Sequence, residues 1–203
     1  MSGGPAPVLE TERLSLHRFG LDDAPFVLEL LNQPSFLRFI GDKGVRSLDD
    51  ARAYLADGPQ ASYARHGYGL WLVRRKRDGA PLGMCGLLKR DALPDPDLGF
   101  AFVPRAWGKG YAFEAAAATL AHGHEVLSLG AIVAVTSPDN LRSIRLLEKL
   151  GLRDAGPVEL APGEPACRLY GRPGRAAARP GGGPRRGPYS PRAARPQCGR
   201  AST

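Results

Sequence analysis

The sequence predicts an α+β fold, in which a mixed, mainly antiparallel sheet of about six to seven strands is flanked by about four helices. Three observations lead to this prediction. Short apolar runs that fit strands dominate the first half of the chain, and three of them follow one another with short connections. A long segment with helical spacing begins near residue 109. Beyond it, strand and helix patterns alternate as far as residue 170.

The chain opens with the pattern of a strand followed by helices. Residues 13–18 alternate leucines with polar residues, as a half-buried strand does. Asp22 and Asp23 then provide a helix start before an apolar cluster. A second helix is predicted after Ser47, which stands at a capping position, and Pro59 predicts an interruption of that helix.

Three strands follow in the middle of the chain. Residues 69–74 and 82–88 are apolar runs joined by the charged segment 75–79, whose Asp-Gly pair favours a hairpin turn. Residues 97–103 form the next strand after a proline-containing turn. Because consecutive strands with short connections run in opposite directions, these three are predicted to form an antiparallel meander.

From Lys109 the spacing of apolar residues becomes helical, and Gly130 provides a stop signal. Residues 131–136 are a β-branched apolar run, short enough for a buried strand. Pro138 opens a further helix that Gly151 closes. The side chains predicted to face inward from that helix are Leu141, Ile144, Leu147 and Leu150. Two weaker strands complete the pattern, at residues 158–160 and 166–170.

The net positive charge is concentrated at the C-terminal end. Of the 28 Lys and Arg residues, eight arginines lie in residues 171–203, which contain no Asp or Glu. The other 20 basic residues balance the 20 acidic ones, so residues 1–170 are predicted to form one neutral domain without a polyanionic partner. Residues 171–203 have too few large aliphatic side chains for a core, which predicts a disordered Arg/Gly/Pro-rich tail. Nucleic-acid binding through these arginines is the functional alternative for the tail.

Cysteine usage and hydropathy predict a cytoplasmic protein. Cys85, Cys167 and Cys198 are an odd number at spacings that match neither a disulfide framework nor a zinc site, which favours a reducing compartment. No segment approaches the roughly 20 apolar residues of a membrane span, and the first residues lack the apolar core of a signal peptide. His122 and His124 stand two positions apart on a predicted helix and point in different directions, so no metal site is expected.

Two closely spaced glycines, Gly108 and Gly110, join the strand at residues 97–103 to the following helix. Without a Cβ at these positions, the backbone can approach an anion closely. The first N–H groups of the helix, those of Tyr111 and Ala112, have no intrahelical partner and can donate to phosphate oxygens. The segment is therefore a candidate phosphate-binding loop.

Two positive side chains, Arg105 and Lys109, stand beside these glycines. A P-loop needs four residues between its glycines and a following Lys-Ser or Lys-Thr, which this segment lacks. A dinucleotide fold needs a third glycine where Phe113 stands, so this alternative is disfavoured too. A plain strand-to-helix turn, with glycines for steric reasons, explains the loop equally well when it is considered alone.

Residues 105–110, Arg-Ala-Trp-Gly-Lys-Gly, resemble the signature Arg/Gln-x-x-Gly-x-Gly/Ala of the GNAT superfamily of acetyl-CoA-dependent N-acetyltransferases. Residues 140–143, Asn-Leu-Arg-Ser, are similar to the helix start in which the family places an Asn after the next strand. Residues 9–18 resemble the opening of the branch that includes the ribosomal-protein N-terminal alanine acetyltransferases. The resemblance covers about residues 8–170 and implies a GNAT-like sheet splayed between its fourth and fifth strands, here residues 97–103 and 131–136.

The resemblance also implies acetyl-CoA as co-substrate and a role for each matched residue. Residues 105–110 would hold the pyrophosphate, and backbone groups of Phe102 and Val103 would pair with the pantetheine arm like an added strand. Asn140 would hydrogen-bond that arm, and Ser143, on the same helix face, would lie near the thioester sulfur. The alternative for Asn140 and Ser143 is an ordinary place in the first turn of a helix, where such residues are favoured.

The groups that move protons are harder to assign. Many relatives protonate the leaving thiolate with a Tyr seven positions after the Asn, and Leu147 stands there in this chain. Ser143 is then the predicted proton donor, with Tyr170 as a distant second choice. Asp97, before the strand that leads to the loop, is a candidate water-mediated base, and a surface carboxylate at a strand edge is the alternative.

The predicted reaction is direct attack of a primary amine on the acetyl thioester, in a ternary complex and without an acyl-enzyme. The acceptor is a protein N-terminal α-amine or a small-molecule amine. The chain is expected to act as a monomer or homodimer, without a membrane or a metal. Two alternatives come from other classes: a nucleic-acid-binding protein that acts through its basic tail, and a non-catalytic acyl-CoA-binding sensor.

Overall fold

The computed structural model describes residues 6–163 and 165–172. Its larger sheet has five antiparallel strands in chain order. They are β1 (Leu9–Glu10), β2 (Leu14–Arg18), β3 (Leu70–Arg75), β4 (Pro81–Leu88) and β5 (Asp97–Phe102). The predicted meander is confirmed, because Trp71 pairs with Cys85 between β3 and β4, and Cys85 pairs with Phe100 between β4 and β5.

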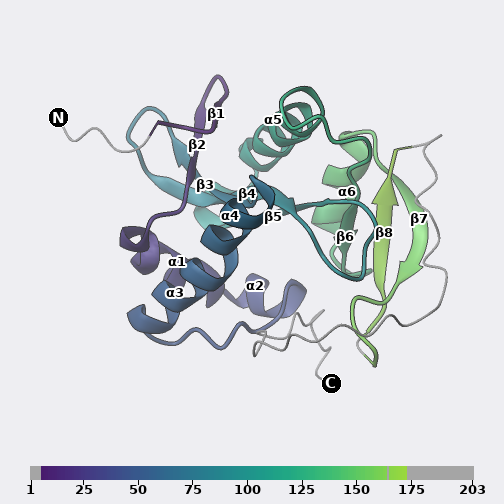
Figure 1. Cartoon of the computed structure of the whole chain (residues 1–203), viewed down its shortest axis with the longest axis horizontal. Helices are drawn as coiled ribbons and strands as arrows, with labels where there is room; N and C mark the ends of the chain where they lie inside the picture. Colours follow the sequence, from purple (N-terminus) through teal and green to yellow (C-terminus); the bar gives the residue numbers. More distant parts are fainter. Residues whose placement is uncertain (1–5, 164, 173–203) are drawn as a thin grey trace.

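A second sheet of three strands lies beside the first (Figure 1). Its order is β6 (Ala134–Thr136), β8 (Cys167–Gly171) and β7 (Arg153–Val158), and both pairings are antiparallel. A parallel bridge between Asp97 and Val133 joins β5 to the segment before β6. Beyond this bridge the two strands diverge, so the predicted splay between the strands at residues 97–103 and 131–136 is confirmed.

Helices cover both faces of the larger sheet. Figure 1 shows α5 on one side of it and α1 to α3 on the other. The α-helices of the described part of the chain are α1 (Ala24–Leu31), α2 (Pro34–Phe39), α3 (Leu48–Leu55), α4 (Ala61–His66), α5 (Tyr111–Glu125) and α6 (Leu141–Lys149). On α5, the buried side chains of Ala115 and Ala116 are small, which lets this helix lie close against β4 and β5.

Local signals explain where α3 and α4 begin and end. The Ser47 hydroxyl accepts the N–H of Asp50 at 3.1 Å, and the Asp50 carboxylate accepts the N–H of Ser47 at 2.9 Å. The predicted interruption is a π-helical turn, Ala56–Gln60, because Pro59 has no N–H to continue the α-helical ladder. α4 ends at Gly67, whose φ of 79° suits a left-handed cap.

Several element positions differ from the prediction. α2 is absent from the sequence prediction because a helix of six residues is too short to show a period. β7 occupies Arg153–Val158 rather than residues 158–160, and it shows little apolar alternation because most of its side chains are exposed.

Two predicted helices also need correction. α5 ends at Glu125, short of the stop predicted at Gly130, and Ser128 beyond it adopts a left-handed φ of 54°. On α6, Leu147 is buried as predicted, but Leu141 is 59% exposed. Leu141 occupies the first helical position, before the amphipathic face of α6 is established.

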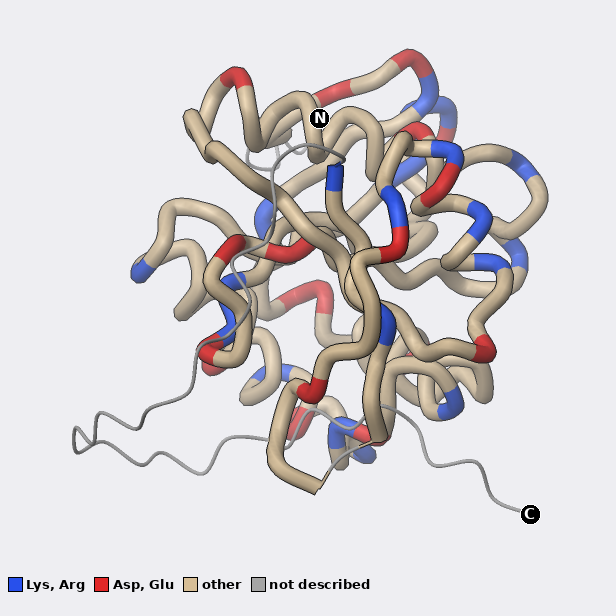
Figure 2. The backbone as a smooth tube through the Cα atoms, turned by 90° about the vertical axis from the view of Figure 1, so that its right-hand side faces the viewer, with Lys and Arg blue, Asp and Glu red and all other residues tan. Residues whose placement is uncertain are grey.

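Residues 173–203, which include nearly all of the predicted tail, lie outside the described residues. β8 extends to Gly171, so the last predicted strand is present. Along the described backbone, Lys and Arg are interspersed with Asp and Glu (Figure 2), in line with the balanced charge of this part. None of the helices in this part is long and apolar enough to cross a bilayer.

Candidate active site

The opening between the two sheets is set by hydrogen bonds at its closed end. The Leu98 N–H donates to the Val133 carbonyl at 2.8 Å, and the Val133 N–H donates to the Pro96 carbonyl at 3.0 Å. Backbone groups of alternate residues in a strand point the same way, so those of Phe100 and Phe102 point to the same side as those of Leu98. No strand of the described chain pairs with them there, because β6 pairs with β8 instead. β5 therefore presents an open strand edge along the opening.

Val103 differs from the role expected for it. Its N–H donates to the Leu82 carbonyl at 3.0 Å, and its carbonyl accepts the N–H of Ala106 at 2.9 Å. The Phe102 carbonyl accepts the indole N–H of Trp107 at 2.8 Å, which leaves the Phe102 N–H on the open side. The open backbone groups thus belong to Phe100 and Phe102, because strand alternation turns Val103 toward β4.

The loop after β5 has the backbone shape of an anion site. Gly108 and Gly110 adopt positive φ values of 72° and 80°, which only glycine adopts without strain. The first helical hydrogen bond of α5 runs from the Glu114 N–H to the Gly110 carbonyl at 3.0 Å. The N–H groups of Tyr111 and Ala112 precede that bond and have no acceptor within residues 6–163 and 165–172. The residues present therefore fit a pyrophosphate.

The two basic side chains of this loop are engaged within the protein. Arg105 forms an ion pair with Glu29 of α1, and both side chains are about half exposed. The Lys109 ammonium donates to the Arg105 carbonyl at 2.9 Å. These contacts brace the loop, while the backbone N–H groups of Tyr111 and Ala112 stay available for an anion.

A third cation, Arg13 of the segment before β2, was not expected at this loop. Its Nη1 donates to the Lys109 carbonyl at 3.0 Å, and its Nε donates to Glu114 Oε2 at 2.7 Å. The guanidinium also lies 4.8 Å from the ring centroid of Tyr111. Arg13 stands within the segment 9–18 that resembles a family branch, but that resemblance attached no role to it.

Glu114 holds Arg13 in place. Burial alone would raise the pKa of Glu114, but hydrogen bonds from the Thr11 hydroxyl and from the backbone and side chain of Arg13 together lower it. The carboxylate is therefore charged at neutral pH, and it ties the start of the chain to the first turn of α5.

The start of α6 lies across the opening from β5. Asn140 is the N-cap of this helix, and its Oδ1 accepts the N–H of Ser143 at 3.2 Å. This contact is the ordinary helix-capping role that was the alternative to cofactor binding for Asn140. It uses only the oxygen of the Asn140 amide. The Asn140 amide nitrogen and the Ser143 hydroxyl have no hydrogen-bond partner in the described part of the chain.

A cavity of about 910 Å³ opens beside Asn140 and Ser143. Its walls come from α2, α3, α4, β5, β6 and α6, and Leu147 forms part of the α6 side. Residues 105–112 do not line this cavity, so the anion loop and the cavity are separate features of the opening. Tyr170 does not line it either and is buried in β8.

Asp97 lines the same cavity and is only 1% exposed. Arg90 Nε donates to both carboxylate oxygens at 3.0 Å. Burial raises the pKa of Asp97, and the charge and hydrogen bonds of Arg90 act in the opposite direction. The exposed strand-edge carboxylate considered for Asp97 is therefore excluded.

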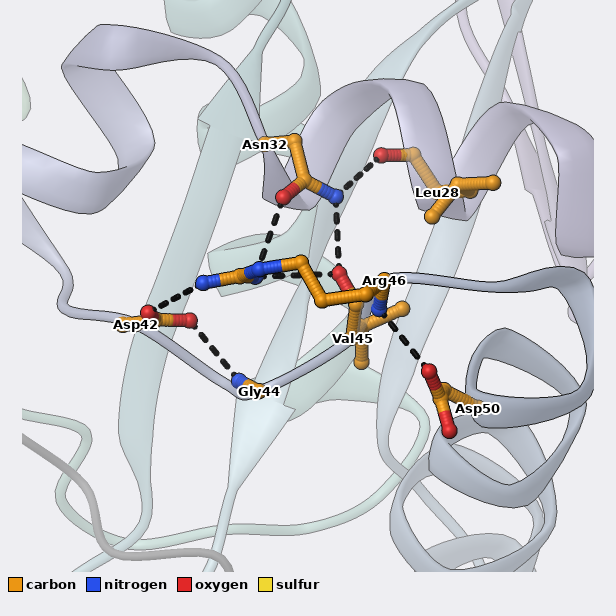
Figure 3. A network of polar contacts seen from close by, with 7 residues as sticks. All are labelled: Leu28, Asn32, Asp42, Gly44, Val45, Arg46 and Asp50. Carbon is orange, nitrogen blue, oxygen red and sulfur yellow. Dashed lines mark hydrogen bonds and ion pairs between the residues drawn. The ribbon is translucent and has the colours of Figure 1, made fainter.

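The loop between α2 and α3 contributes Gly44 and Val45 to one rim of the cavity, and Figure 3 shows the polar contacts that hold this loop. Arg46 holds this loop: its Nη1 donates to Asn32 Oδ1 and to the Val45 carbonyl, both at 3.1 Å, and it pairs with Asp42. The hydrogen bond from Arg46, followed by that from the Gly44 N–H, lowers the pKa of Asp42. A single arginine thus fixes the shape of this rim.

Within the described residues, no three His, Cys, Asp or Glu side chains are grouped as a metal site would require. The opening between the sheets combines an anion loop, an open strand edge, a capped helix start and a cavity with a buried carboxylate. These groups suit a transferase that positions two substrates.

Comparisons with known proteins agree with this class. Residues 13–153 match the family model of the acetyltransferase (GNAT) domain. The uncharacterized protein YkkB of Bacillus subtilis is 31% identical over 147 residues, which cover 71% of this chain and 84% of that protein. The crystal structure of the acetyltransferase from Agrobacterium tumefaciens has a TM-score of 0.67 and 26% identity, and covers 84% of this chain and 96% of its own.

A second similar structure is RimL, a ribosomal L7/L12 α-N-acetyltransferase in complex with coenzyme A. Its TM-score is 0.70 at 16% identity, with 82% of this chain and 97% of that chain covered, so it shows a shared fold. Fold and site define an acetyl-CoA-dependent N-acetyltransferase. The chain belongs to the GNAT acetyltransferase family.

Proposed function

We propose that this enzyme acetylates the primary amine of an acceptor that enters the cavity bounded by α2, α3 and β5. The observation that carries the proposal is the position of Asp97, Asn140 and Ser143 on one cavity, with the anion loop outside it. Donor and acceptor then approach the reacting centre from different sides. This arrangement supports direct transfer in a ternary complex, without an acyl-enzyme.

Each part of the opening has a partner on acetyl-CoA, which supplies the activated acetyl thioester. The N–H groups of Tyr111 and Ala112, with the backbone at Gly108 and Gly110, would bind the pyrophosphate. The open edge of β5, at Phe102 and its neighbour Phe100, would bind the amide groups of the pantetheine arm. The Asn140 amide nitrogen would donate to the same arm. The engaged side chains of Arg105 and Lys109 contribute through loop shape and positive potential.

The buried carboxylate of Asp97 accepts the proton that the acceptor amine must lose. An α-amine with a pKa of about 8 is roughly one-tenth neutral at pH 7, whereas a Lys side chain with a pKa of about 10.4 is neutral less than ~0.1% of the time. An α-amine therefore needs less help from a base. A pKa raised by burial makes Asp97 a better proton acceptor than an exposed aspartate.

Ser143 is the proton donor for the departing thiolate in this proposal. Its hydroxyl is on the cavity wall, and the aliphatic side chain of Leu147 on the same wall has no proton to give. The donor must also leave the Asn140 cap intact, and Ser143 does so because only its backbone N–H is engaged.

A protein N-terminus is the acceptor suggested by two likenesses. The opening residues 9–18 resemble a branch of N-terminal acetyltransferases, and RimL, which has the same fold, is a ribosomal L7/L12 α-N-protein acetyltransferase. The low pKa of an α-amine points in the same direction. A small-molecule amine has the same reacting group and is the second acceptor to test.

The test is release of coenzyme A thiol from acetyl-CoA, measured with and without a panel of primary amines. Ser143→Ala should lower kcat by about a hundredfold, the lower end for a lost general acid, with the KM for acetyl-CoA within about twofold. Ser35→Ala, the same change on α2 at a residue that does not line the cavity, is the matched control. An unchanged kcat in Ser143→Ala would reject the proton-donor assignment, and amine-independent thiol release would reject acetyl transfer to amines.

A further inference from the structure

Aromatic and aliphatic side chains form the acceptor side of the cavity. Phe39, Tyr54 and Phe100 come from α2, α3 and β5 respectively, and each is only partly buried. Further apolar lining residues on this side are Phe36, Ile40 and Leu88. Side chains from elements far apart in the sequence thus surround one apolar space, which suits the body of a small ligand.

The carboxylates of the cavity are already occupied or lie at its exposed rim. Asp97 is held by Arg90, and Asp50 accepts the N–H groups of Arg46 and Ser47 in the cap of α3. Asp57 is the remaining carboxylate among the described lining residues, and it is exposed.

Positive side chains on the same cavity oppose a cationic ligand. Lys43, Arg65 and Arg90 line it along with the three carboxylates, so the lining has no net negative charge. Burial raises the pKa of Tyr54 to about 12, so its phenol adds no negative charge at neutral pH. A ligand with several ammonium groups would have to bury charges inside a cavity whose buried carboxylate, Asp97, is already paired with Arg90.

Tyr54 offers a polar contact within this apolar wall. Its hydroxyl has no hydrogen-bond partner in the part of the chain that the structure describes, although the side chain lines the cavity. Because the side chain is only partly buried and lines the cavity, this hydroxyl is accessible to a ligand group such as an amine or an amide.

We propose that the acceptor is a monoamine whose amine is attached to an apolar or aromatic body, and that polyamines are rejected. This inference rests on the acetyl transfer proposed above. The aromatic side chains at positions 39, 54 and 100 enclose the apolar body, while Asp97 accepts one proton from the single ammonium group and leaves the neutral amine. The same chemistry occurs in an arylalkylamine and in a peptide that begins with an apolar residue.

The experiment compares kcat/KM for four acceptors with the full chain at saturating acetyl-CoA. The acceptors are 2-phenylethylamine, a peptide amide with an N-terminal Phe, ethanolamine and spermidine. At least one of the first two should exceed both ethanolamine and spermidine by at least about tenfold, since loss of apolar contact costs that much in selectivity. The better of the two apolar substrates distinguishes a free amine from a peptide N-terminus.

Variants separate the apolar wall from general effects on the enzyme. Phe39→Ala should lower kcat/KM for the apolar acceptor by about tenfold and leave ethanolamine within about twofold, and Phe39→Leu should retain most of the preference. Val126→Ala, an exposed apolar residue at the end of α5, is the control. Arg65→Glu should raise kcat/KM for spermidine, whereas Arg153→Glu, an exposed site on β7 outside the cavity, should not.

A kcat/KM for spermidine equal to or above that for both apolar acceptors would overturn the acceptor class and leave acetyl transfer intact. So would an unchanged preference in Phe39→Ala, because the apolar wall would then not select the acceptor. If acetyl-CoA binds but none of the amines is acetylated, the proposed function fails and the acceptor class fails with it.

Discussion

Replacing Arg13 with Ala removes the side chain that joins the start of the chain to the anion loop. The loop would lose the hydrogen bond from Nη1 to the Lys109 carbonyl, and Glu114 would lose its ion pair. Glu114 would keep the Thr11 hydroxyl and the backbone N–H of residue 13 as donors, so it would not become an unpaired buried charge. The perturbation therefore acts mainly on the shape of the loop.

The contacts of Arg13 set the size of the effect. Its side chain is 44% exposed, so the ion pair with Glu114 contributes no more than about 1 kcal/mol to the free energy of unfolding. A hydrogen bond from a charged donor contributes about 1.5 kcal/mol, and this one forms only when the loop has its present shape. If the binding-competent shape becomes less favourable by ~1.4 kcal/mol, the apparent affinity for acetyl-CoA falls by up to about tenfold.

Steady-state kinetics with acetyl-CoA as the varied substrate would measure this effect. We expect Arg13→Ala to raise the KM for acetyl-CoA by about five- to tenfold with kcat within about twofold, since the cavity residues are untouched. Arg13→Lys should recover only part of the loss, because an ammonium cannot bond the loop carbonyl and Glu114 in the same fork. Arg52→Ala, which removes an exposed ion pair with Asp49 on α3, is the control. An unchanged KM, or full recovery by Lys, would refute loop positioning by the guanidinium.

Three further perturbations address the loop, the rim and the base. Gly110→Ala should raise the KM for acetyl-CoA and lower the free energy of unfolding by about 1–2 kcal/mol, because the φ of Gly110 is positive. Gly67→Ala, also at a positive φ, is the control and should lower the free energy of unfolding by a similar amount without changing that KM. Arg46→Ala should raise the KM for the amine and leave the KM for acetyl-CoA unchanged. An equal rise of the amine KM in the control Arg52→Ala would contradict this prediction. At saturating amine, kcat should fall as the pH is lowered, with an apparent pKa above the ordinary aspartate value of 3.8. The reason is that burial raises the pKa of Asp97 and that the protonated carboxyl cannot act as a base. Asp97→Asn should remove this pH dependence and lower kcat at neutral pH by at least about tenfold, and a pH dependence that persists would exclude Asp97 as the base.

Much of the fold follows from short-range patterns. The meander is predictable because the Asp-Gly pair at residues 78–79 is a local turn signal, and the cap at Ser47 depends on residues three positions apart. The short α2 carries no readable period, and β7 lacks apolar alternation because its side chains are exposed. Elements that bury little therefore escape prediction, whereas elements that build the core do not.

In the site, too, the features set by neighbouring residues could be predicted, and those set by residues far apart in the sequence could not. The positive φ values of the loop and the cap at Asn140 depend on neighbouring residues, and both stand where the sequence suggested. The contact between Arg13 and Glu114 joins residues 101 positions apart, and no local pattern could reveal it. Strand alternation decides that Val103 turns toward β4, and this requires the register of β5, which the sequence alone does not provide.

An interrupted sheet usually exposes a strand that can recruit another chain. Most proteins guard such a strand with lysines, prolines or a bulge, because free N–H and C=O groups promote aggregation. Here the edge of β5 that is open at Phe100 and Phe102 faces the second sheet, and the other edge of β5 pairs with β4. An edge between two sheets offers less room to a second chain than an edge at the periphery of a sheet, so this strand can keep open N–H and C=O groups for a ligand at a lower risk of self-association.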